Sequence, residues 1–150
     1  VGQGMVGYLI SEEGLSFAQQ VAHEAEFRYL IYPRPEEQVF KGPVVVLIDE
    51  LSVSTAELFA RVLQLSDRAV IIGTPSAGRV LSSMVERLPN GDRLQLVIAD
   101  LQSMDGQSIE GVGVLPDREV PYQLEALRLQ KDMALLEGIS WIHSQSGDSE

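Results

Sequence analysis

Two short runs made almost entirely of apolar residues stand near the middle of the chain. Residues 43–48 read Pro-Val-Val-Val-Leu-Ile, and residues 69–73 read Ala-Val-Ile-Ile-Gly. Continuous apolar runs of this length, rich in β-branched residues, predict strands that are buried on both faces. The stretch between them predicts a helix that begins near Ser54 and ends at residues 65–67. A strand, a helix and a second strand predict a βαβ unit with parallel strands, so the expected fold class is α/β.

The segments on either side of this unit carry weaker patterns. Residues 15–30 place apolar side chains at a roughly helical spacing and predict one amphipathic helix, which the prolines that follow would end. Residues 84–88 and 93–101 flank the sequence Pro-Asn-Gly-Asp, which is typical of a tight β-hairpin turn. The region after the βαβ unit is therefore expected to contain a β-hairpin.

The last third of the chain predicts a turn and then helix. A second turn is expected at residues 105–106, where Asp is followed by Gly. Residues 122–142 carry Leu, Met and Ile at mixed three- and four-residue intervals, which predicts a terminal helix or helix pair. The polar residues 144–150 predict a disordered tail. We expect residues 1–150 to form a single domain, cut from a longer parent because the chain does not start with Met.

Composition narrows the classes of partner and cofactor. The chain has 11 Lys and Arg against 22 Asp and Glu, and its formal net charge of −11 argues against a nucleic-acid surface. It contains no cysteine, which excludes disulfides, thiolate zinc sites and cysteine nucleophiles. No apolar run approaches the roughly 20 residues that a membrane-spanning helix needs. We therefore expect no nucleic-acid partner, no membrane span, no metal and no cofactor.

Ser54 is the best candidate for a chemical centre. It follows a buried strand and precedes a helix, whose first N–H groups can solvate the charge that develops when a serine attacks a carbonyl. The same serine, followed three residues later by Glu57, matches a capping box, which is a purely structural arrangement. No G-x-S-x-G elbow surrounds it, so the α/β-hydrolase arrangement is excluded. From spacing alone, the catalytic and the capping interpretations both stay open.

A second loop has the outline of a phosphate-binding loop without its chemistry. Residues 73–80 nearly match G-x-x-x-x-G-K-[ST], but Arg79 replaces the lysine and Val80 cannot ligate Mg²⁺. A strand is expected after this loop where a phosphate loop needs a helix, so a simple turn is the better interpretation. His23 and His143 lack any metal-ligand spacing and are more typical of solvated side chains than of bases or ligands.

A set of short motifs, taken in order, resembles the C-terminal processing (tail-specific) peptidases and their tricorn-core and interphotoreceptor retinoid-binding-like relatives. The resemblance spans residues 42–120 and rests on Gly42-Pro43-Val44-Val45-Val46-Leu47, Ser52-Val53-Ser54-Thr55-Ala56-Glu57, Asp67-Arg68-Ala69-Val70-Ile71-Ile72-Gly73, Gly78, Leu88-Pro89-Asn90-Gly91 and Gly111-Val112-Gly113-Val114-Leu115-Pro116-Asp117. It implies a crotonase-like (ClpP/crotonase) α/β fold with a βαβ core, a following β-hairpin region and a C-terminal helix. It also implies a serine peptidase that cleaves unstructured polypeptides or protein C-termini, in a periplasmic or secreted setting.

The resemblance assigns roles position by position. Ser54 resembles the family nucleophile, and the backbone N–H of Thr55 then resembles one oxyanion-hole donor. A second donor would come from the Gly-rich segment at the start of the chain, with Gly4 as the candidate. The family's lysine base falls at Arg79, and arginine stays protonated and cannot accept the serine proton. Glu110 is similar in position to the glutamate of tricorn-like members.

The departure at Arg79 leaves two hypotheses open. In the first, the chain is the core of a serine peptidase, with Ser54 as nucleophile and Glu110 as an orienting or basic group. A histidine from an upstream segment of the longer parent would then complete a tricorn-like site. In the second, the chain is a degenerate, non-catalytic module that binds a peptide or an apolar ligand, and Arg79 pairs with a carboxylate. Both hypotheses allow a homo-oligomer through exposed sheet edges.

Overall fold

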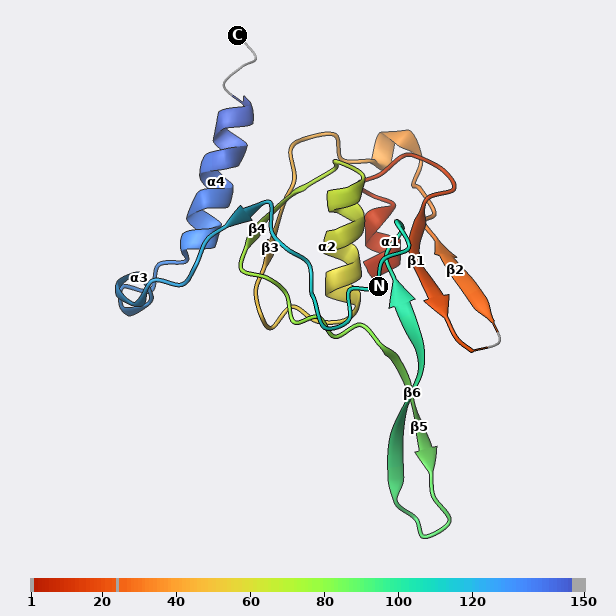
Figure 1. Ribbon diagram of the computed structural model, residues 1–150. Helices are drawn as coiled ribbons and strands as arrows, with labels where there is room; N and C mark the ends of the chain where they lie inside the picture. The colour runs from red at the N-terminus through yellow and green to blue at the C-terminus, as the bar shows by residue number, and fades with distance from the viewer. Residues whose placement is uncertain (1, 24, 147–150) are drawn as a thin grey trace.

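The computed structural model describes residues 2–23 and 25–146 (Figure 1). Its elements, in chain order, are α1 (Gly2–Val6), β1 (Ser16–Val21), β2 (Glu26–Leu30), the 3-10 helix η1 (Glu36–Gln38), β3 (Val45–Ile48), α2 (Thr55–Leu65), β4 (Val70–Gly73), β5 (Ser82–Arg87), β6 (Arg93–Gln102), β7 (Arg118–Glu119), α3 (Leu124–Arg128) and α4 (Met133–Ser146). Two sheets organise these elements, one parallel and one antiparallel.

The parallel sheet has the strand order β3-β4-β7. β3 and β4 pair from Val45 opposite Val70 to Ile48 opposite Gly73. Helix α2 connects them on one side of the sheet, and α4 lies on the other side (Figure 1). The α4 helix packs so closely that a Cβ on Gly138 would lie 3.2 Å from Cγ1 of Val45. The predicted βαβ unit and the α/β class are therefore confirmed.

The helix predicted over residues 15–30 is wrong, because this segment belongs to the antiparallel sheet. That segment forms two strands, β1 and β2, which pair antiparallel, and β1 also pairs with β6 in the order β2-β1-β6-β5. The apolar residues taken for a helical face are split between the strands, with Phe17 buried on β1 and Phe27 exposed on β2. Pairing with a distant strand decides the conformation here, because short apolar segments are ambiguous between helix and strand. His23 accordingly lies between two strands and not on a helix.

The two ends of the described chain are helical. The Gly-rich segment at the start forms the short helix α1. Residues 144–146, assigned to a disordered tail, belong to α4, so His143 lies in the last turn of a helix, while residues 147–150 lie outside the described residues. The predicted terminal helix pair is confirmed as α3 and α4. In the described part of the chain, none of the helices combines the length and apolar character that crossing a membrane requires.

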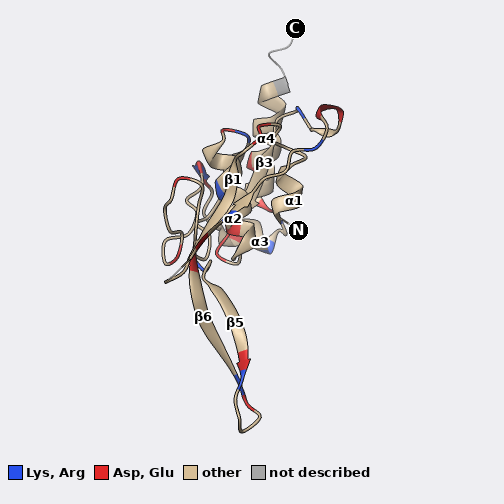
Figure 2. Cartoon of the chain, turned by 90° about the vertical axis from the view of Figure 1, so that its right-hand side faces the viewer, with Lys and Arg blue, Asp and Glu red and all other residues tan. Residues whose placement is uncertain are grey.

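The predicted hairpin is confirmed as β5 and β6. Its turn is closed by the N–H of Leu88, which donates to the carbonyl oxygen of Asp92 at 2.9 Å. The second predicted turn is confirmed as well, since the N–H of Ser103 donates to the carbonyl of Gln107 at 2.9 Å. The hairpin projects away from the rest of the chain (Figures 1 and 2). β5 begins just after Arg79, whose carbonyl oxygen accepts from the N–H of Ser54 at 3.1 Å, so the hairpin begins close to the candidate chemical centre.

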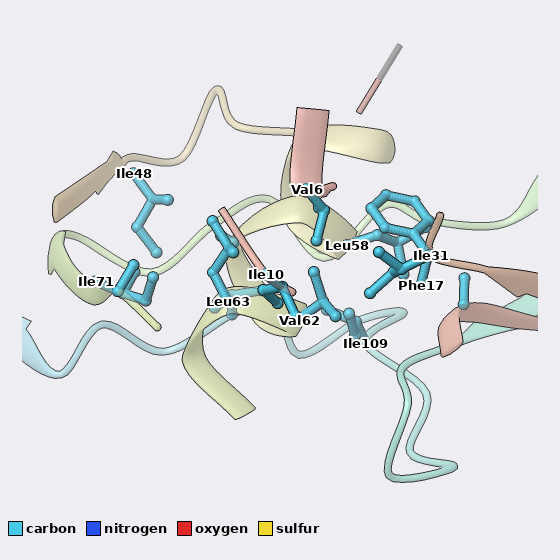
Figure 3. Packing of buried hydrophobic residues seen from close by; sticks show 14 of the residues in the cluster. Val6, Ile10, Phe17, Ile31, Ile48, Leu58, Val62, Leu63, Ile71 and Ile109 are labelled. Carbon is cyan, nitrogen blue, oxygen red and sulfur yellow. The ribbon is translucent and has the colours of Figure 1, made fainter. Parts of the chain in front are cut away.

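The core gathers around one face of α2 (Figure 3). Leu58, Val62 and Leu63 are 3%, 1% and 0% exposed and recur at helical spacing. They belong to one cluster with Val6, Ile10, Phe17, Ile31 and Ile109. Each fully buried side chain of this size stabilises the fold by roughly 1.5–3 kcal/mol. The cluster therefore fixes α2, and with it the position of the residues at its first turn.

An ion pair ties the outer side of α2 to the turn after β6. Nη2 of Arg61 lies 2.8 Å from Oδ2 of Asp105. Burial alone would raise the pKa of Asp105, but hydrogen bonds from Ser103 and the N–H of Gln107, together with the Arg61 guanidinium, hold it below its usual value. A lowered carboxyl pKa in the folded state adds stability above the unfolded-state pKa, and this stability is lost as the pH falls below that value.

The substitution Asp105→Asn tests this contact. We expect it to lower the free energy of unfolding by about 1 kcal/mol at neutral pH, since the pair is partly exposed and screened. The difference from the parent chain should shrink as the pH falls below about 4. Urea unfolding at several pH values measures it, with Glu125→Gln on the exposed side of α3 as a control. A difference that stays constant down to acid pH would contradict the assignment.

Candidate active site

Ser54 stands in a strained conformation directly before α2. Its φ and ψ are 58° and −121°, a left-handed value of φ that side chains other than glycine rarely adopt. Strain of this kind costs on the order of 1–3 kcal/mol and persists only where surrounding contacts enforce it. Here the N–H of Ser54 donates to the carbonyl oxygen of Arg79 at 3.1 Å and to Oε2 of Glu57 at 2.9 Å. A sharp, enforced turn from strand to helix presents an exposed serine at the positive end of α2.

Glu57 enforces that turn. It is 0% exposed. Its Oε2 accepts from the N–H groups of Ser54 at 2.9 Å and Arg79 at 3.0 Å. Its Oε1 accepts from the N–H of Gly78 at 2.7 Å and the hydroxyl of Ser76 at 2.6 Å. The glutamate half of the predicted capping box is confirmed, but the carboxylate does more, because it joins α2 to the whole loop 76–79.

A second close approach holds the same loop from its other side. The hydroxyl of Ser76 accepts from the N–H of Val114 at 2.7 Å. The carbonyl oxygen of Gly78 accepts from the N–H of Gly111 at 2.9 Å. Gly113 has a φ of 78°, and a Cβ there would lie 2.4 Å from the carbonyl oxygen of Ser76. Glycine is therefore required at residue 113 for these two segments to touch.

Arg79 meets Ser54 through its main chain. Its carbonyl oxygen accepts from Ser54, and its N–H donates to Glu57. Arg79 is exposed, and its guanidinium forms no ion pair with any residue in 2–23 or 25–146. The structure thus brings the main chains of the two sequence-predicted residues together.

Glu110 contacts the segment that follows Arg79. Its Oε2 accepts from the N–H of Val80 at 2.8 Å and from that of Leu81 at 3.2 Å. Glu110 is half-buried, and its own N–H donates to the hydroxyl of Ser108 at 3.2 Å. The contacts of this carboxylate position the chain just before the start of β5.

The start of the chain reaches the first turn of α2. A Cβ on Gly2 would lie 2.6 Å from Cγ2 of Thr55, whereas a Cβ on Gly4 would meet nothing within 4 Å. Gly2 rather than Gly4 therefore lies against the residue expected to supply an oxyanion donor. Neither His23 nor His143 belongs to the elements around Ser54. Among the described residues, no cluster of His, Asp or Glu is arranged to hold a metal ion.

A separate pocket of about 450 Å³ opens at the ends of β3 and β4, against α3 and the start of α4. Its lining includes Leu47, Asp49, Thr74, Tyr122, Leu127 and Lys131, but not Ser54 or Arg79. Burial, and then the nearby carboxylates of Glu50 and Asp49, raise the pKa of Tyr122, so its phenol stays protonated at neutral pH. This pocket is a second concave surface, distinct from the serine.

Glu57→Gln tests the carboxylate. An amide keeps the shape of the side chain but turns an NH₂ group toward at least one pair of donors, so two hydrogen bonds are lost and replaced by repulsion. We expect a loss of about 2–4 kcal/mol in the free energy of unfolding. Glu86→Gln, on the exposed hairpin, is the matched control and should change stability by less than about 0.5 kcal/mol. Equal stabilities of the two variants in urea unfolding would refute the role given to Glu57.

Known proteins resemble this chain in sequence and in fold. Residues 5–120 match the model of peptidase family S41. The chain is 30% identical over 82 residues to the carboxyl-terminal-processing protease of Picosynechococcus sp., which covers 55% of this chain and 20% of that protein. Mature CPAF is 30% identical with a TM-score of 0.67, over 77% of this chain and 23% of that one.

The fold is shared more widely than the sequence. The photosystem II D1 C-terminal processing protease superposes with a TM-score of 0.67 at 24% identity, over 89% of this chain and 35% of that one. The chain thus spans a fifth to about a third of the lengths of these proteins. The family match covers most of the chain and includes the strand, the serine turn and the loop described above. The chain therefore belongs to peptidase family S41, the serine peptidases that include the C-terminal processing peptidases.

Proposed function

We propose that this chain carries the nucleophilic centre of a peptidase that cleaves unstructured polypeptides or protein C-termini through Ser54. The observation that carries the proposal is the enforced left-handed turn at Ser54, held at the first turn of α2 by Glu57 and Arg79. A role as nucleophile explains the strained conformation of Ser54 better than a role as helix cap, because a capping serine needs no left-handed φ. The parallel sheet with α2 packed on it also supports the crotonase-like architecture.

In the proposed reaction, Oγ of Ser54 attacks the carbonyl carbon of a peptide bond and its proton passes to a base. The C–N bond then breaks, the leaving amine takes up that proton, and water hydrolyses the acyl-enzyme to free the serine. The N–H of Thr55, at the start of α2, stabilises the oxyanion, and a second donor comes from the glycine segment against it, with Gly2 better placed than Gly4. Glu110 orients the segment that follows Arg79. Arg79 cannot take the proton, so the base comes from elsewhere in the assembled site.

A fluorophosphonate probe followed by intact-mass measurement tests this centre. We expect a single adduct on the parent chain and none on Ser54→Ala. We also expect Arg79→Lys to form the adduct at least about tenfold faster, because a lysine beside the serine can lose its proton and act as the base. Circular dichroism of each variant controls for folding. An adduct that survives in Ser54→Ala would contradict the assignment.

The second candidate function is a non-catalytic module that binds a peptide or an apolar ligand. Two observations favour it: the exposed Arg79 guanidinium without an ion pair in the described part of the chain, and the separate 450 Å³ pocket lined in part by Leu47 and Leu127. Arg79 would then pair with a carboxylate such as a peptide C-terminus.

Titration calorimetry with one peptide, carrying either a free or an amidated C-terminus, tests the second candidate. Tighter binding of the free carboxylate, lost in Arg79→Gln, is the result expected of a binding module. Equal affinities for the two peptides would remove the reason to assign Arg79 this role.

A further inference from the structure

The β5–β6 hairpin leaves the body of the protein and is uncovered on both faces (Figure 1). Its large apolar side chains are 40–61% exposed: Met84, Val85, Leu94, Leu96, Val97 and Ile98. A two-stranded ribbon is marginally stable by itself in water. An extended ribbon with this much apolar surface therefore indicates a protein partner.

The outer edge of the hairpin is a free strand edge. Within the described sheet, β5 pairs with β6 alone and ends the order β2-β1-β6-β5. The N–H of Leu88 donates to the carbonyl of Asp92, so these two residues form a hydrogen-bonded pair. Bonded and non-bonded pairs alternate along an antiparallel ladder, so the main-chain groups of Met84 and Glu86 also bond to β6. The N–H and C=O groups of Val85 and Arg87 then point away from the sheet. Such an edge is a template for another strand.

The distribution of charge selects a second copy of this chain as the partner. The net charge of −11 makes most pairs of surfaces on two copies repel each other. In residues 82–98, however, Glu86 and Asp92 are balanced by Arg87 and Arg93. Figure 2 shows these charges near the tip, with most of the ribbon uncharged. Two hairpins can therefore approach without the repulsion that opposes contact elsewhere.

We propose that two copies pair antiparallel through their β5 edges, about a two-fold axis near Val85. Each outward N–H and C=O then finds a partner, and the two antiparallel sheets become continuous. Val85 lies opposite the second copy's Val85, a β-branched pair that suits a sheet. Centring the contact on Glu86 instead would set two carboxylates directly opposite each other, which disfavours that register.

This register brings the tip of each hairpin to the candidate active site of the other copy. β5 covers Ser82–Arg87, so antiparallel pairing centred on Val85 directs the turn at residues 88–92 of one copy toward the segment just before Ser82 of the other, which contains Arg79. Asp92 is the acidic residue of that turn. The second copy thus places a carboxylate beside the guanidinium that has no ion pair in the described part of the chain. The pairing does not depend on whether Ser54 hydrolyses peptides.

Sedimentation velocity over a range of concentrations tests the pairing, with two matched substitutions. Val85→Lys sets two cations opposite each other and should weaken dimerisation at least about tenfold. Val97→Lys makes the same change at the same exposure, 60% against 61%, but on the inner strand β6. It should change the dissociation constant less than about threefold, because the two new charges are separated by more than a screening length. Circular dichroism confirms that both variants fold.

A charge exchange tests the register. Asp92→Arg and Arg79→Asp should each weaken dimerisation about three- to tenfold, and the double exchange should restore it. A monomer at every concentration would overturn the proposal. Equal losses from Val85→Lys and Val97→Lys would place the contact on the face of the ribbon and overturn edge pairing. A double exchange without rescue would overturn the register that sets Asp92 beside Arg79.

Discussion

The carboxylate of Glu57 is the contact on which the rest of the candidate site depends. A buried negative charge is stable in a protein only when hydrogen-bond donors replace the water it has lost. In the described chain these donors are main-chain N–H groups and one serine hydroxyl, not cations, and they come from two separate segments. The charge can therefore be satisfied only when the first turn of α2 and the loop 76–79 are both in place. The interaction couples the local shape of the site to the fold as a whole.

Glu110 binds main-chain N–H groups in the same way, in the segment that follows the loop 76–79. It collects the N–H groups of Val80 and Leu81, where the loop has not yet become a strand and ladder hydrogen bonds are missing. The carboxylates of Glu57 and Glu110 thus accept the main-chain hydrogen bonds that a neighbouring strand would accept in a sheet, because the segment between β4 and β5 has no strand partner there. This explains how an irregular loop keeps a defined path beside Ser54, and why the base of the long hairpin is fixed although the hairpin itself is exposed.

The apolar runs at residues 43–48 and 69–73 predicted the βαβ unit correctly, but only the second strand is buried as expected. β3 lies at the edge of its sheet, and Leu47 on it is 39% exposed. Residues 15–30 failed because their pattern fits a short strand pair as well as a helix, and contact with β6 decides between them. Ser54 could be found from its place between strand and helix. The burial of Glu57 could not be predicted, because its donors other than Ser54 come from residues 76–79, far along the chain. The spacing of Ser54 and Glu57 is the same for a cap at the surface and for a buried carboxylate.

The left-handed conformation of Ser54 has a consequence for how this sequence responds to selection. Glycine would adopt the same φ without strain, so the fold by itself favours glycine at that position. A search for variants that resist heat, carried out without any assay of chemistry, would drift toward replacing the serine. Persistence of the serine in such a search would mean that its hydroxyl stabilises the fold, as a helix cap does, whereas its loss would leave chemistry as the reason why the natural chain keeps it. Stability therefore favours glycine at residue 54, whereas the proposed chemistry requires serine.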